Sequence, residues 1–248
     1  YEYIILNLLR YYNLMIHIGK GNKINQDIKM LEEVISYLQK GPASDNPVIT
    51  TYQYLLLLKL KNKEEYYFIL KDLYRKHFSF MDAEDAYRTH MYIFGYCMDK
   101  YNFDADRRFI TECYELYKHS YKNNMVTLGE LLYPDFVNYV KVFVRAGDIR
   151  ITRKFISDYG GKLPDDQKNN CLNFSDAYIC HYEGEFKKAL EYLSKVNFPL
   201  AILKVQVRIM QVQLHYQAGH YEQTREVIES FTKVLRRETV ISDDYKNS

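Results

Sequence analysis

Hydrophobic residues recur at helical spacing along nearly the whole chain. Across residues 2–18 the apolar positions fall three or four residues apart, as they do on one face of a helix. Further helices are expected over residues 24–40, 47–61, 64–77, 83–100, 105–121, 131–145 and 148–159, and four more between Pro164 and Arg237. No stretch shows the alternation typical of a strand. The pattern predicts an all-α chain of twelve helices that pair as six hairpins.

Residue types that begin or end helices stand at the expected borders. Asn46 before Pro47 predicts an N-cap with proline in the first turn, and Asp82 predicts a second N-cap. The run from Gly19 to Asn22 is expected to end the first helix, so that residues 2–18 and 24–40 form the first hairpin. Gly160-Gly161 is expected to be the C-cap of the helix over 148–159.

Three turn glycines recur at nearly constant intervals. Gly184 and Gly219 lie 35 residues apart, and each is followed two residues later by an aromatic residue, Phe186 or Tyr221. Gly147 opens a similar turn 37 residues before Gly184. A single amphipathic hairpin cannot cover its own apolar face, so a repeat of this length predicts hairpins stacked into an α-solenoid.

The interval between turns is longer in one part of the chain. Residues 119–134 lengthen the interval between the turns at Tyr101 and Gly147 to 46 residues, which predicts an extended loop, a longer helix or a kink. We therefore expect degenerate helical repeats over residues 1–122, clearer repeats over 131–237 and a tail over 238–248. These parts are expected to form one continuous solenoid.

The unit at residues 170–203 resembles a tetratricopeptide repeat. It has small residues where helices must approach closely, Ala177 and Ala189, and a turn, Glu183-Gly184-Glu185-Phe186, close to the family's G-x-Y/F. The next unit keeps Ala218-Gly219-His220-Tyr221 but has Thr224 where a small alanine is usual. The resemblance is best over about residues 170–237. It implies a right-handed superhelical array of about six antiparallel hairpins, whose first helices line a concave face that holds peptides.

The resemblance also implies a set of binding residues on that concave face. They combine aromatic rings, amides and two cations, a mixture that can hold a peptide backbone and a carboxylate. In the two matching units and the weaker unit before them, these residues are Lys141, Arg145, Phe174, Tyr178, His181, Tyr182, Ile209, Gln213, Tyr216 and Gln217.

Composition narrows the possible functions. The net charge of +2, from 34 basic and 32 acidic residues, provides no overall field for nucleic acid or an anionic membrane. Four cysteines without a C-x-x-C pair indicate reduced thiols and a cytoplasmic location. No hydrophobic run is long enough to span a membrane. Because the chain begins at Tyr1 without methionine, we expect further domains or a targeting sequence outside it.

No arrangement of reactive residues predicts an enzyme. The seven histidines are scattered, H-E-x-x-H does not occur, and the Gly19-Lys20-Gly21 run lacks the spacing of a phosphate-binding loop. We therefore predict no catalytic residue, no metal and no cofactor.

The favoured hypothesis is a non-enzymatic scaffold that binds a protein or peptide. Two alternatives remain open. The chain could be a peptide-sensing regulatory domain of a larger transcription or signalling protein, which an adjacent helix-turn-helix would indicate. It could also bind RNA, since pentatricopeptide arrays share the 35-residue period, but the balanced charge argues against this alternative.

Overall fold

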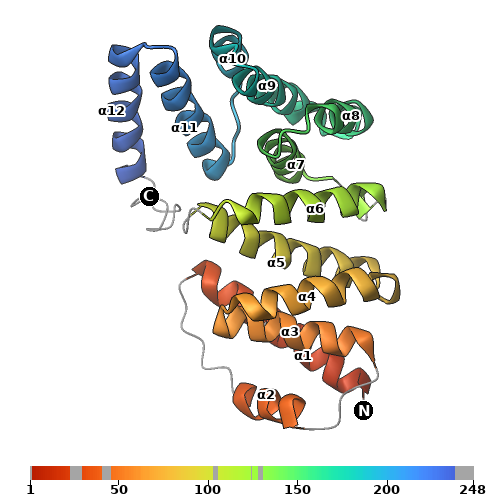
Figure 1. The fold of residues 1–248 in the computed structure, drawn as a ribbon. Helices are drawn as coiled ribbons and strands as arrows, with labels where there is room; N and C mark the ends of the chain where they lie inside the picture. Colours follow the sequence, from red (N-terminus) through yellow and green to blue (C-terminus); the bar gives the residue numbers. More distant parts are fainter. Residues whose placement is uncertain are drawn as a thin grey trace. The chain divides into compact units, whose positions relative to one another are not determined.

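The computed structural model describes residues 2–22, 30–40, 46–102, 106–123, 125–127 and 131–237 (Figure 1). Within these ranges the chain forms twelve α-helices and three short 3-10 helices, with no strand. The all-α prediction is confirmed. The chain divides into two compact units, an N-terminal unit of residues 1–100 and a C-terminal unit of residues 101–248. Each unit is described separately below.

The N-terminal unit is built around a helix that is hydrophobic on several sides. This helix, α3, buries four consecutive leucines at positions 55–58, so it requires neighbours around most of its circumference. Helices α1 and α4 pack along it. The helices of this unit are α1 (Glu2–Asn22), α2 (Leu31–Lys40), α3 (Pro47–Lys61), α4 (Glu64–His77) and α5 (Ala83–Asn102), with the 3-10 helix η1 at Phe78–Phe80.

The predicted helix starts in this unit are confirmed by their hydrogen bonds. The Asn46 side chain accepts a hydrogen bond from the Val48 backbone N–H at 3.0 Å, and the Asp82 carboxylate accepts one from the Asp85 N–H at 2.8 Å. At the other end of α3, Asn62 adopts the left-handed conformation with φ of 49°. Asparagine tolerates this conformation better than most residues, so it can end the helix there.

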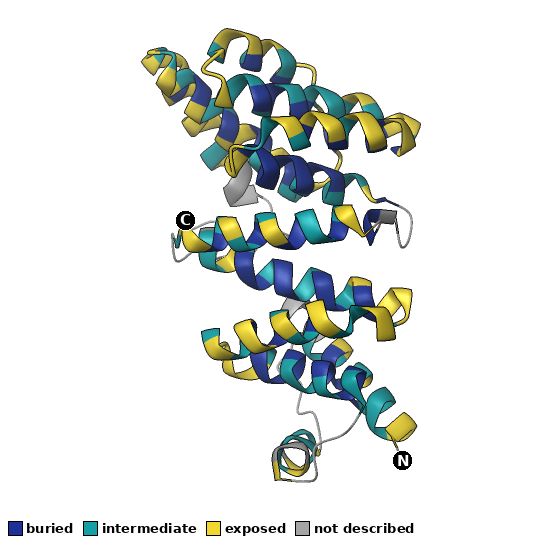
Figure 2. Ribbon diagram, turned by 45° about the vertical axis from the view of Figure 1, so that its right-hand side comes forward, coloured by how far each residue is buried: buried dark blue, intermediate teal, exposed yellow. Residues whose placement is uncertain are grey.

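The C-terminal unit stacks helices in a regular order. Helices α7, α9 and α11 each pack against the helix that follows, α7 also packs against α9, and α10 packs against α11. Most helices carry buried residues on one side and exposed residues on the other (Figure 2). The elements are α6 (Arg108–Lys122), η2 (Met125–Thr127), α7 (Tyr133–Arg145), α8 (Ile149–Tyr159), η3 (Gly160–Lys162), α9 (Asp165–Tyr182), α10 (Phe186–Leu193), α11 (Ala201–Gln217) and α12 (Tyr221–Arg237).

The three turn glycines have nearly the same backbone geometry. Their φ angles are 81° at Gly147, 79° at Gly184 and 77° at Gly219, values that favour glycine because it lacks a Cβ atom. In each turn the residue after the glycine donates its N–H to the carbonyl five residues earlier, at 3.0, 2.8 and 2.8 Å in chain order. This hydrogen bond is typical of a Schellman helix end. The predicted turns are therefore confirmed.

An aromatic cluster forms the core of the C-terminal unit around α7. Phe143 is fully buried, and five aromatic rings surround it at centroid distances of 5.7–6.4 Å. Tyr117 and Tyr139 stack with their centroids 3.8 Å apart. The Tyr139 hydroxyl donates to the Ser120 hydroxyl at 2.9 Å, so the ring can be buried without an unsatisfied polar atom.

Four expectations about helix ends and pairing are corrected. The run from Gly19 to Asn22 lies inside α1, and α1 packs along α3 without comparable contact to α2 in the described residues. The first expected hairpin is therefore not found. Gly160 has φ of −59° and continues into η3, so the glycine pair is not a left-handed C-cap. Helix α6 begins at Arg108, and part of the expected helix over 24–40 lies outside the described residues.

Candidate functional site

Helices α1, α3 and α5 of the N-terminal unit line a groove of about 760 Å³. This volume falls within the range of about 300–1,000 Å³ that is usual for ligand sites. Its walls are mainly apolar and aromatic. They include Leu14 and Ile16 on α1, Leu55 and Leu58 on α3, and Tyr87, Met91, Tyr92 and Tyr96 on α5.

A glycine in the middle of α5 contributes to the hollow. Gly95 lines the groove, and a Cβ atom built on it would meet no atom within 4 Å. Glycine inside a helix costs about 0.5–1 kcal/mol relative to alanine, because it loses more conformational freedom on folding. No close packing requires glycine at this position. Its effect on the structure is to leave space in the groove.

The polar groups at the edge of the groove are held in defined positions. The Lys59 ammonium lies 3.3 Å from the Tyr92 ring centroid and donates to the Asn13 carbonyl at 2.8 Å. Arg88 forms an ion pair with Glu84 one turn earlier on α5. Burial raises the pKa of Tyr92 to about 12, and the nearby Arg88 charge opposes this rise. Tyr92 is therefore a neutral phenol at physiological pH.

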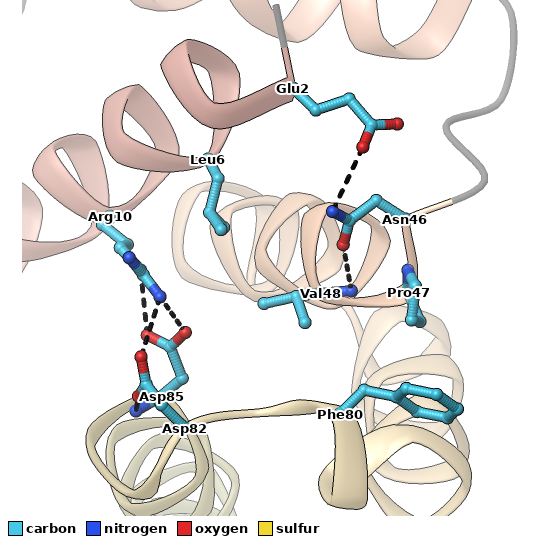
Figure 3. A pocket seen from close by; sticks show the side chains of 9 residues that line it. All are labelled: Glu2, Leu6, Arg10, Asn46, Pro47, Val48, Phe80, Asp82 and Asp85. Carbon is cyan, nitrogen blue, oxygen red and sulfur yellow. Dashed lines mark hydrogen bonds and ion pairs between the residues drawn. The ribbon is translucent and has the colours of Figure 1, made fainter.

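A second hollow in the N-terminal unit, of about 540 Å³, is more polar (Figure 3). Arg10 on α1 contacts the carboxylates of Asp82 and Asp85, and the Tyr52 hydroxyl donates to Asp85 at 2.6 Å. Burial, followed by the bond to Asp85, raises the pKa of Tyr52 well above its usual value. Since Arg10, Tyr52 and the two aspartates bind one another, we interpret this network as a link between α1, α3 and α5.

The predicted binding residues lie on α7, α9 and α11 of the C-terminal unit. The structure brings two of them together, because the His181 Nε2 and Gln217 Oε1 atoms lie 2.6 Å apart and join α9 to α11. Arg145 lies over the Tyr101 ring at 5.1 Å and next to Tyr178, whose pKa is raised by burial. Four further predicted residues have exposed side chains: Tyr182, Ile209, Gln213 and Tyr216.

Two residues that were predicted to be exposed on the concave binding face are buried instead. Phe174 has no exposed surface and packs against Phe198 with the ring centroids 5.6 Å apart. Lys141 is only 5% exposed and lies among buried residues of α7. Both positions are therefore part of the core of the C-terminal unit, in which α7 and α9 pack against each other. Burial, followed by the charge of Arg145, lowers the pKa of Lys141 to about 7.

The groove along α1, α3 and α5 was not predicted from the sequence. One signal could have indicated it, namely Gly95 within an otherwise regular helical pattern, because glycine inside a helix often has a packing or functional reason. The remaining lining residues have ordinary helical spacing and give no signal by themselves.

Searches for metal-binding and membrane-spanning features found neither within the described ranges. There, no three His, Cys, Asp or Glu side chains are close enough to hold a metal ion. No helix built from those residues has both the length and the hydrophobicity to cross a bilayer. Comparison with known proteins gave no match to a protein-family model, a curated protein or a solved structure.

Proposed function

We propose that this protein is a non-enzymatic scaffold that binds a peptide segment of a partner protein in the groove along α1, α3 and α5. The observation that carries the proposal is the groove itself, an apolar hollow of about 760 Å³ with aromatic walls and charged edges. Large exposed hollows of this kind are unusual on surfaces without a binding role.

The lining residues favour a segment with large apolar side chains. Met91 is flexible and polarizable, so it can adapt to differently shaped side chains. The tyrosines offer flat apolar faces for contact. Lys59, Glu84, Arg88 and Asp99 provide charges of both signs around this apolar centre. A segment with one or two large apolar side chains between polar residues would match this arrangement, with its apolar side chains inside the groove.

The architecture that we propose is an α-solenoid similar to tetratricopeptide arrays. Supporting features are the turns at Gly147, Gly184 and Gly219 and the packing of α7 on α9 and of α10 on α11. In such an array the first helix of each hairpin lines one face. The groove residues lie on α1, α3 and α5, and the predicted residues of the C-terminal unit lie on α7, α9 and α11. We propose that α1, α3 and α5 form the binding face of the N-terminal unit, and that α7, α9 and α11 form that of the C-terminal unit.

The exposed residues of the C-terminal unit are proposed as a second contact for the partner. Tyr216 is 63% exposed, and its ring packs at 5.8 Å against Tyr221 at the start of α12. Together with Tyr182 and Ile209 it supplies apolar surface, and the linked His181 and Gln217 side chains supply polar atoms. Partner binding in the cytoplasm, as a scaffold or as the sensing domain of a regulator, is the role that we propose.

Filling the groove at Gly95 is expected to abolish peptide binding. The experiment selects peptides from a random display library on the 248-residue chain and measures their dissociation constants by fluorescence anisotropy. The Gly95→Trp variant should weaken binding by at least about tenfold, because the indole would occupy the hollow. The fold should be retained, since a Cβ atom at position 95 meets no other atom within 4 Å.

Gly161→Trp is the matched control. Gly161 also has open space around an added Cβ, and it belongs to the C-terminal unit and is not one of the residues that line the groove. This variant should bind the selected peptides as the unmodified protein does. Equal binding by the Gly95→Trp variant, with its circular dichroism and melting temperature unchanged, would place the peptide site elsewhere. Selection of no peptide above background would reject peptide binding itself.

A further inference from the structure

Lys141 on α7 is a buried amine with no opposite charge beside it. It is 5% exposed, and its neighbours on the helix include Val137, Val140 and Val144, all buried. Within the described residues, no carboxylate forms an ion pair with it and no group accepts a hydrogen bond from it. The Nζ atom keeps slight contact with solvent, but an unpaired ammonium that has lost most of its hydration is still costly.

The nearest charged group makes the ammonium less favourable still. Arg145 lies one helical turn after Lys141, over the Tyr101 ring and beside Tyr178 on α9. Both burial and this guanidinium lower the pKa of Lys141, to about 7. At neutral pH the fraction of uncharged amine is therefore roughly a thousandfold higher than for an ordinary lysine. An uncharged amine is a nucleophile, whereas an ammonium is not.

The Arg145 guanidinium, unlike burial, would favour a negative charge on the lysine. A guanidinium repels an ammonium but forms strong hydrogen bonds with a carboxylate-like group. The low exposure of Lys141 also limits which molecules can react with its amine. Lys141 is only 5% exposed, and a small, neutral molecule needs less access to its amine than a peptide or a hydrated oxyanion does.

We propose that Lys141 is a modification site for carbon dioxide, and that the resulting carbamate pairs with the Arg145 guanidinium. In this step the lone pair of Lys141 Nζ forms a C–N bond to the carbon of CO₂, and one C=O π pair moves onto oxygen. The extra proton on nitrogen then passes to solvent. One amine and one CO₂ give one carbamate and one proton, and nothing is oxidised or reduced. This proposal does not depend on peptide binding.

Carbon-13 NMR of the full chain in ¹³C-bicarbonate buffer tests this assignment. A carbamate resonance of Lys141 is expected beside that of the α-amino group, and Lys141→Met should remove only the Lys141 resonance. Lys187→Met, which removes an exposed lysine, should leave it unchanged. Arg145→Met should reduce its intensity several-fold, because the carbamate loses its counter-charge and the amine regains its proton more readily. Alkylation of the carbamate followed by peptide mass spectrometry should locate the adduct at Lys141.

Two outcomes would overturn the proposal. In the first, the folded protein shows no adduct at Lys141, or no more than at exposed lysines. In the second, inorganic phosphate shifts the Lys141 side-chain resonances while bicarbonate gives no adduct, which would assign a reversible oxyanion site instead. Lys141→Met removes the amine and keeps a long unbranched side chain, and circular dichroism of this variant checks that it folds.

Discussion

Replacing Phe143 with alanine is expected to lower the free energy of unfolding of the C-terminal unit by about 3–5 kcal/mol. Phe143 is fully buried, and the rings of Tyr114, Tyr117, Tyr121, Tyr139 and Phe155 surround it. Removing the ring loses its burial and leaves a cavity that rigid neighbouring rings cannot fill. Aromatic pairs in tilted or edge-to-face geometry add about 0.5–1.5 kcal/mol each beyond burial, so few substitutions should have a larger effect.

Hydrogen exchange followed by mass spectrometry measures this effect locally. Peptides from α7 and α8 should lose protection in Phe143→Ala, and peptides from α3 in the N-terminal unit should keep it. Phe80→Ala is the control, because Phe80 is 68% exposed and its removal creates no cavity. A loss of less than about 1 kcal/mol in α7 would show that Phe143 is not in a close-packed core.

Lys141 is expected to make the protein more stable as pH rises from about 7 to 9.5. Its pKa is about 7 in the folded chain and near 10.5 when exposed. Below pH 7 both states bind the proton, so this lysine contributes no slope. Above pH 7 the unfolded chain binds a proton that the folded chain does not, so the free energy of unfolding increases with pH. Across this window the rise is at most roughly 3 kcal/mol.

Urea denaturation in CO₂-free buffer at several pH values measures this dependence. The Lys141→Met variant is the reference, because other groups titrate equally in both proteins. As the pH rises from 7 to 9.5, the free energy of unfolding of the unmodified protein should increase relative to that of Lys141→Met. A difference that stays constant from pH 7 to 9.5 would show that Lys141 is protonated and paired in the folded chain.

The sequence predicts most of the helices because their signals are local. Helical spacing of apolar residues, Asn46 and Asp82 at helix starts, and the left-handed turn at Gly184 depend only on residues a few positions apart. They can therefore be predicted without knowing which helices pack against each other. The predicted helix ends were wrong at two glycines. Gly19 was expected to end the first helix but lies inside α1, and Gly160 was expected to be a C-cap but continues into the 3-10 helix η3.

The candidate site was harder to predict because it depends on packing between distant helices. Lys141 has an ionisable side chain and stands where the repeat resemblance implies the concave face, yet it is only 5% exposed. Phe174 is buried against Phe198, which follows α10 and lies 24 positions later in the sequence. The groove in the N-terminal unit combines side chains from α1, α3 and α5, and their meeting cannot be read from spacing within any one helix.

The central claim, that the groove along α1, α3 and α5 holds a peptide, is tested most directly by methionine methyl NMR. The chain has seven methionines, of which Met91 lines the groove and Met210 is buried in α11. Met91→Leu assigns the first resonance. Titration with a selected peptide should shift the Met91 methyl resonance to saturation at the measured dissociation constant and leave Met210 unchanged. Saturable peptide binding with an unshifted Met91 resonance would contradict the account.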